Sequence, residues 1–198
     1  SCGLFYVARF NNSQNFSDGY VEFTSSTIEV YFTDDSDVNL LSRNSPANIA
    51  LIEAMTPWAT LTGHANLGGI AAPNAVVNGT GTLTGSTLSG SGFGLLDVTG
   101  GIDEVVAFLD ADGIMDAAGG LADIAYTASF NNNVLNPFDE SSGLAVGCRT
   151  GQAAVGAWCY QGTSNIRGDT QQVPAPAPLA LLAIGLLGVG VASRSRKS

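Results

Sequence analysis

The last segment of the chain, residues 173–198, most limits what the rest can fold into, because its composition does not suit a packed domain. It opens with the stretch Val173–Pro178, whose alternating prolines favour an extended backbone and cannot continue a helix. An almost purely apolar run follows from Leu179 to Ala192. The chain then closes on three basic side chains, Arg194, Arg196 and Lys197. We therefore expect a folded domain over residues 1–172 and a separate tail.

The apolar run has the length of a short membrane anchor. Its 14 residues extend about 21 Å as a helix at roughly 1.5 Å per residue, less than the roughly 30 Å hydrocarbon core of a bilayer. The basic end, residues 193–198, can complete the span, because its long side chains reach cytoplasmic water while their stems stay in lipid. A buried core helix is the alternative that this length favours, and the clustered positive charges argue against it. We expect a single apolar anchor helix over residues 179–192.

Three features of the tail together resemble the PEP-CTERM sorting signal of Gram-negative bacteria: the motif Val173, Pro174, Ala175 and Pro176, the Leu/Ala/Gly run, and the Arg-rich end. The resemblance implies that an exosortase-type enzyme recognises the proline motif, cleaves near it and passes the protein to the surface. Ala175 stands where the signal usually has glutamate, which bears on the subclass of sorting enzyme. The expected location is the inner membrane before processing, through the anchor helix, and then the cell surface or extracellular matrix.

Charge in front of the tail is strongly acidic. The chain carries 7 basic and 17 acidic residues, and three of the basic ones lie in the last five positions. Residues 1–172 thus hold four basic residues and all 17 acids, a net charge of −13 (4 − 17). Such a surface repels phosphate backbones, so we expect no nucleic-acid partner.

The domain is rich in short segments with β character. The clearest is Thr27–Thr33, in which Ile28, Val30 and Phe32 alternate with residues of the opposite face. The further expected strands are Phe5–Phe10, Tyr20–Phe23, Ala75–Val77, Thr80–Leu88, Phe93–Val98, Val105–Leu109, Ile124–Phe130 and Ala153–Tyr160. Frequent Gly, Asn and Asp clusters between them indicate turns. This pattern predicts an all-β fold, an antiparallel, jelly-roll-like β-sandwich.

One short helix is expected within this domain, from Pro46 to about Met55. Ser45 can cap its first turn, and Pro46 suits the first helical position. The Thr/Gly-rich stretch Gly79–Gly101 and the run Asn165-Ile166-Arg167-Gly168 are in addition similar to the bodies of PEP-CTERM proteins. This second resemblance implies that the latter run is the closing strand of the domain.

Calcium is the one cofactor that the sequence raises. Asp110, Asp112 and Asp116 have the D-x-D-G-x-x-D spacing found in part of acidic calcium loops, where close carboxylates and a glycine turn suit a hard cation. The pattern is incomplete, because Phe108 and Gly119 stand where the first acid and the closing glutamate belong. A solvated turn between strands is the alternative.

Enzymatic residues are sparse, and we expect no enzyme. His64 is the only histidine, which excludes a metal site built from several histidines, and no Gly-x-Ser-x-Gly nucleophile motif is present. A surface or turn histidine is the expected role of His64. Acid pairs such as Asp103/Glu104 and Asp139/Glu140 have the residue types of a glycosidase, but 17 acids always include such pairs.

Cysteine usage agrees with export. Cys148 and Cys159 bracket a glycine-containing stretch and are expected to form a disulfide in the periplasm, with Cys2 left over. Taken together, the sequence predicts a structural or interaction protein of the cell surface or exopolysaccharide matrix. The alternative is a carbohydrate-binding β-sandwich of the biofilm matrix, in which an exposed aromatic such as Trp58 or Trp158 stacks on polysaccharide.

Overall fold

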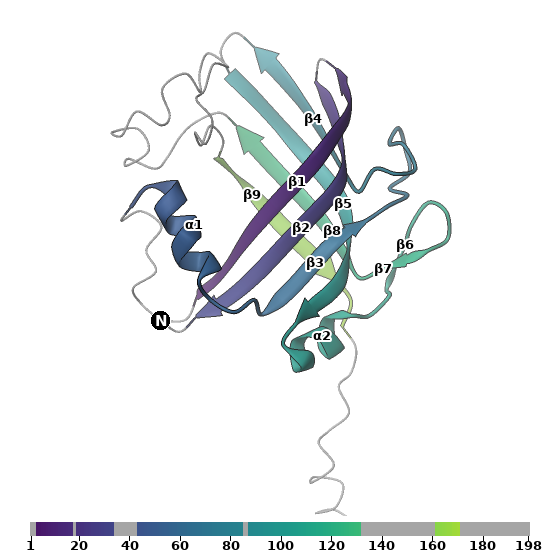
Figure 1. The fold of residues 1–198 in the computed structure, drawn as a ribbon. Helices are drawn as coiled ribbons and strands as arrows, with labels where there is room; N and C mark the ends of the chain where they lie inside the picture. Colours follow the sequence, from purple (N-terminus) through teal and green to yellow (C-terminus); the bar gives the residue numbers. More distant parts are fainter. Residues whose placement is uncertain (1–2, 18, 34–42, 85–86, 132–160, 171–198) are drawn as a thin grey trace, which may run out of the picture.

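The computed structural model describes residues 3–17, 19–33, 43–84, 87–131 and 161–170, and this part of the chain is mostly β. Seven strands form one antiparallel sheet (Figure 1): β1 Gly3–Ser17, β2 Tyr20–Thr33, β3 Ala59–His64, β4 Val77–Thr84, β5 Thr87–Gly101, β8 Ile124–Asn131 and β9 Gln161–Gly168. A small hairpin and two helices complete it: β6 Ile114–Met115, β7 Leu121–Ala122, α1 Ser45–Glu53 and α2 Asp103–Leu109. The all-β expectation is confirmed for these residues.

The strand order follows the chain as a meander, β1-β2-β3-β5-β8-β9. Strands β3 and β4 share one place between β2 and β5, because each pairs with a different half of both neighbours. Residues 20–23 of β2 pair with β4, and residues 27–30 pair with β3. Among the described strands the sheet is therefore one continuous meander, without the crossing connections of a jelly roll.

This single sheet supplies both layers around the core. Strands β1 and β2 cross over β8 and β9 (Figure 1), and the Phe10 ring of β1 lies 5.8 Å from the Tyr126 ring of β8. Tyr6 of β1 also hydrogen-bonds Ser164 of β9 through its hydroxyl. The enclosed core consists of Ile28, Val30, Ala59, Leu61, Leu96, Val98, Ile124 and Tyr126. Within the described residues, the long antiparallel sheet thus coils so that it buries one of its faces against itself.

Helix α1 covers a second apolar cluster. Ile52 of the helix packs with Val7 of β1 and Tyr31 of β2. The alternation predicted for Thr27–Thr33 is thereby confirmed, since Tyr31 lies in this cluster while Ile28 and Val30 lie in the main core. The predicted helix is also confirmed, but its cap is Asn44 rather than Ser45: the Asn44 side chain accepts a hydrogen bond from the Ala47 N–H at 3.0 Å.

Three strand predictions were wrong. Of the predicted strand Ala75–Val77, only Val77 lies in a strand, as the first residue of β4, whereas Ala75 and Val76 belong to the loop before it. Val105–Leu109 belongs to helix α2, whose first turn carries Asp103 and Glu104, favourable at the positive end of a helix. Val105, Val106 and Leu109 pack against the core from one side of this helix. In so short a segment, an apolar run of this kind fits a buried strand as well as a helix. Thr80–Leu88 is two strands, because the chain reverses between the paired residues Thr84 and Thr87.

Several expectations lie outside the described residues. These are the strand Ala153–Tyr160, the disulfide between Cys148 and Cys159, and the whole tail from Val173 to Ser198. Within the part that the structure describes, no helix is long and apolar enough to span a bilayer. The strand β9, ending at Gly168, agrees with the predicted closing strand.

Candidate functional site

His64, at the end of β3, lies between two carboxylates. Its Nδ1 is 2.8 Å from Asp97 Oδ1 on β5, and its Nε2 is 2.9 Å from Asp116 Oδ2 in the turn after β6. The side chain of His64 is 16% exposed and that of Asp116 only 2%. The predicted surface or turn position is therefore wrong. Sequence reasoning missed the contact because the partners are distant along the chain.

The two carboxylates favour the charged form of His64. Burial alone would lower the pKa of His64, but the hydrogen bonds and charges of Asp116 and Asp97 outweigh it and raise the pKa. The hydrogen bond from His64 is in turn the largest of the effects that lower the pKa of Asp116 to about 2. In the protonated form both ring nitrogens donate to the carboxylates, and an imidazolium has no lone pair to accept a proton. This arrangement suits holding the β6–β7 hairpin on the sheet rather than general-base catalysis.

The structure joins Asp123, rather than Asp116, to Asp110 and Asp112. One carboxylate oxygen from each of these three residues lies within 4.8 Å of the others. Of the three aspartates predicted to bind calcium, Asp116 therefore does not belong to the cluster, because its carboxylate contacts His64 instead. The pattern of spacing could not reveal Asp123, which follows β7 and meets the other two only through the fold.

Backbone donors already hold the Asp123 carboxylate. Its Oδ1 accepts from the N–H groups of Ala111 and Asp112 at 2.9 and 2.8 Å, and its Oδ2 accepts from Val98 at 2.8 Å. Repulsion from Asp123 is the largest cause that raises the pKa of Asp110, and burial and Asp112 add to it. Calcium requires roughly six to eight oxygens, of which these carboxylates supply only part. The residues can contribute to a cation site, and calcium remains a prediction.

A comparison of cations tests this cluster. We expect calcium and magnesium, at matched ionic strength, to raise the melting temperature equally, because general screening of the acidic domain affects both alike. Differential scanning fluorimetry on the wild-type chain and on Asp112→Ala measures both shifts. A larger shift with calcium that Asp112→Ala abolishes would contradict the solvated turn and identify a calcium site.

Glu22 is a fully buried charge on β2, with none of its surface exposed. Its Oε1 accepts from the Tyr20 hydroxyl at 2.7 Å and the Ala72 N–H at 2.9 Å, and its Oε2 accepts from Gln14 at 2.9 Å and Asn15 at 2.7 Å. Burial alone would raise the pKa of Glu22, but these four hydrogen bonds outweigh it and lower the pKa to about 2. Glu22 thus ties the β1–β2 hairpin to the loop between β3 and β4.

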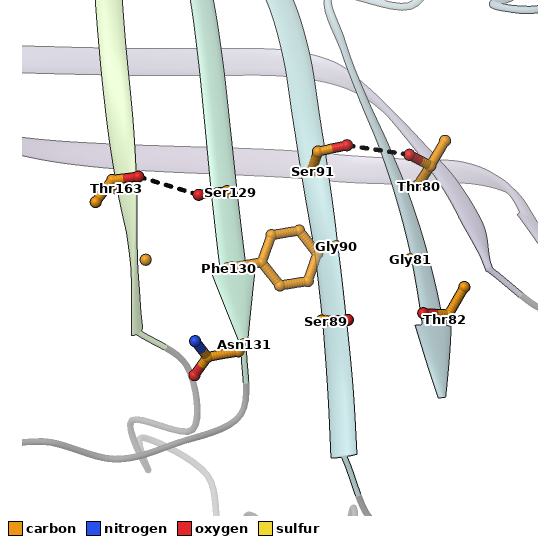
Figure 2. A pocket seen from close by; sticks show the side chains of 11 residues that line it. Thr80, Gly81, Thr82, Ser89, Gly90, Ser91, Ser129, Phe130, Asn131 and Thr163 are labelled. Atoms are coloured by element: carbon orange, nitrogen blue, oxygen red, sulfur yellow. Dashed lines mark hydrogen bonds between the residues drawn. The ribbon is translucent and has the colours of Figure 1, made fainter. Parts of the chain in front are cut away.

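A depression of about 780 Å³ lies over the neighbouring ends of β4, β5, β8 and β9 (Figure 2). Its lining consists of hydroxyl, amide, glycine and one aromatic residue: Thr80, Gly81, Thr82, Ser89, Gly90, Ser91, Ser129, Phe130, Asn131, Gly162 and Thr163. We call this the hydroxyl depression. None of these eleven residues is charged, although the domain is strongly acidic. In the sequence, the alternation of Gly with Thr and Ser over Gly79–Gly92 is the feature that corresponds to this depression, and it predicts only strands.

The other residues considered as site candidates have structural positions. Trp58 is half-buried, packs against the main core and lies 6.0 Å from the Phe32 ring, so it is not the exposed aromatic expected for carbohydrate stacking. Asp103 and Glu104 occupy the first turn of α2. Trp158 and the pair Asp139/Glu140 lie outside the described residues.

Comparison with known proteins adds no relative. No family model matches the chain, and neither the curated proteins nor the solved structures give a significant match.

Proposed function

We propose that this chain is an exported structural or interaction protein of the cell surface or exopolysaccharide matrix, sorted by its tail through an exosortase-type enzyme. The observation that carries the proposal is the fixed order of a proline motif at Val173–Pro176, an apolar run and a basic end. The prolines suit the end of the folded domain, the apolar run suits a membrane anchor helix, and the basic end suits retention on the cytoplasmic side.

The domain in front of the tail is consistent with this role. Its sheet coils to give two-layer packing like that of a sandwich, and β9 ends at Gly168, shortly before the proline motif. The His64 site suits structure better than catalysis, which favours an interaction protein over an enzyme. In the sequence, the proline motif follows closely after Gly168, the last residue of β9, and this nearness to the end of the domain suits access by a sorting enzyme.

Removal of the tail tests the proposal. We expect deletion of residues 179–198 to move the protein from the membrane fraction to the periplasm or medium, because the anchor helix and the basic end are lost together. Cell fractionation followed by immunoblotting measures the change, with Arg194→Lys as a control that keeps the charge and the location. A truncated chain that stays in the membrane fraction would refute the anchoring role.

A second candidate function is carbohydrate binding in the same matrix. The observation that favours it is the uncharged hydroxyl depression in an otherwise acidic domain. This candidate needs the same export and sorting, and it adds polysaccharide as a partner.

A further inference from the structure

The β6–β7 hairpin, residues 114–122, buries little apolar surface. It projects from the side of the main sheet (Figure 1). Met115 is 72% exposed and Leu121 is 47% exposed, and residues 117–120 of the turn are exposed as well. Only Asp116 and Ala122 of the hairpin are buried. Polar contacts, rather than apolar packing, therefore attach the tip of the hairpin to the sheet.

Asp116 divides its two carboxylate oxygens between the turn and the sheet. Its Oδ1 accepts from the N–H groups of Ala118 and Gly120 at 2.7 and 2.8 Å, which closes the turn. Its Oδ2 lies 2.9 Å from His64 Nε2 and accepts from the Asn66 side-chain amide at 3.3 Å. Among these described donors to Asp116, only His64 can carry a charge.

The charges that face His64 are both negative. Asp97 of β5 contacts Nδ1 and Asp116 of the hairpin contacts Nε2, while residues 65–76 of the adjoining loop include no charged side chain. Burial lowers the pKa of His64, but the hydrogen bonds and charges of the two carboxylates outweigh it and raise the pKa. Protonation of His64 and docking of the hairpin therefore favour each other.

Loss of the proton weakens this attachment. A neutral imidazole has one N–H and one lone pair, so it can donate to only one of the two carboxylates, and it no longer attracts either by charge. Because the pKa of His64 is raised above 6.5 in the docked hairpin, its contribution is complete below about pH 6.5. The contribution is lost as the pH rises through the raised value.

We propose that the β6–β7 hairpin is a pH-sensitive conformational switch, docked on the sheet while His64 is protonated and opening locally more often once His64 is neutral. Opening is confined to the tip, residues 115–121. Asp123 holds the base of the hairpin, because its carboxylate accepts from the N–H groups of Val98 and Ala111. This switch goes beyond the proposed function, which does not depend on it.

Hydrogen–deuterium exchange of the purified full chain in neutral detergent, resolved to single amides, tests the switch. Rates at about pH 5.5 and about pH 8.5, either side of the range in which histidine titrates, are divided by the intrinsic exchange rates so that they report opening. The reporters are the Ala117 N–H, which donates to Asn66 O at 2.9 Å, and the Gly120 N–H. We expect both to open about fivefold more often at the higher pH, as when a hydrogen bond loses a charged partner.

The Ala72 N–H is the internal control. It donates to Glu22 Oε1 at 2.9 Å, a buried carboxylate like that of Asp116 but without a histidine. The hydrogen bonds to Glu22 and to Asp116 lower the pKa of each carboxyl to about 2, so neither titrates between the two pH values. Opening at Ala72 should therefore be the same at both.

His64→Gln is the matched variant, because its side chain keeps an amide donor and cannot be charged. We expect its hairpin to open at the higher level at both pH values. The pKa of Asp110, raised chiefly by Asp123 and in smaller part by Asp97, is raised in a group that this variant retains, so any effect of Asp110 remains visible there. The melting temperature reports whether the variant is folded.

Equal opening of the Ala117 and Gly120 amides at the two pH values in the wild type would overturn the switch, and this comparison needs no variant. A pH-dependent increase that the Ala72 amide shares, or that folded His64→Gln retains, would overturn it as well, because the cause would then not be His64.

Discussion

Replacement of His64 by alanine is expected to lower the free energy of unfolding by about 3 kcal/mol at pH 6, the lower end for removal of one partner from a buried ion pair. The Asp116 carboxylate, 2% exposed, would lose its charged donor. It would keep neutral donors, the N–H groups of Ala118 and Gly120 among them, which places the effect at the lower end. Urea denaturation measures the difference.

The pH dependence of this difference has a defined sign. The pKa of His64 is raised above 6.5, so its contribution is complete below about pH 6.5 and is lost as the pH rises through the folded-state value. The pKa of Asp116 is lowered from 3.8 to about 2, so its contribution is complete above about pH 4 and is lost toward pH 2. The wild type and His64→Ala should therefore differ most between about pH 4 and 6.5.

Asp97→Asn is the matched control for His64→Ala. Asp97 is the exposed partner, with 38% of its side chain accessible, and an exposed ion pair contributes about 1 kcal/mol or less. A His64→Ala variant as stable as Asp97→Asn throughout this pH range would show that Asp116 does not depend on the imidazolium.

Glu22→Gln is expected to destabilise the domain by about 2–3 kcal/mol, although the two side chains have the same shape. Four donors converge on the two carboxylate oxygens of Glu22. A glutamine amide would present its own N–H₂ group to two of these donors and leave them unsatisfied in a fully buried place. Thermal and urea unfolding at pH 7 measure the loss.

Glu29→Gln provides the comparison on the same strand. Glu29 pairs with Arg9 at 3.1 Å, and both side chains are partly exposed, at 28% and 45%. Its replacement should change the free energy of unfolding by about 1 kcal/mol or less. Equal stabilities of Glu22→Gln and Glu29→Gln would contradict the view that Glu22 joins the hairpin to the β3–β4 loop as a buried anion.

The local sequence pattern predicted which segments form strands and helices better than it predicted which segments contact one another. Alternation placed Ile28 and Val30 in the core correctly, since a strand with one buried face repeats every second residue. It overlooked β3, although Ala59 and Leu61 show the same alternation, because the segment has only six residues. Helix α2 was mistaken for a strand because its seven residues give less than two full repeats of the helical pattern.

The candidate sites were harder to foresee, because each is assembled from distant segments. Asp123 reaches Asp110 and Asp112 through the β6–β7 hairpin, and His64 reaches Asp116 across 52 positions. The hydroxyl depression depends on register: a shift of one residue between β5 and β8 would turn Ser129 away from Ser91. No local spacing in a single sequence encodes that alignment.

The mass of the mature C-terminus tests the central claim most directly. Protein collected from the cell surface would be digested, and its last peptide identified by mass spectrometry. Sorting through an exosortase-type enzyme predicts an end near the proline motif Val173–Pro176, without the apolar run, and an intact chain in a host that lacks the enzyme. Surface protein that still carries the basic end, through Lys197 and Ser198, would contradict it.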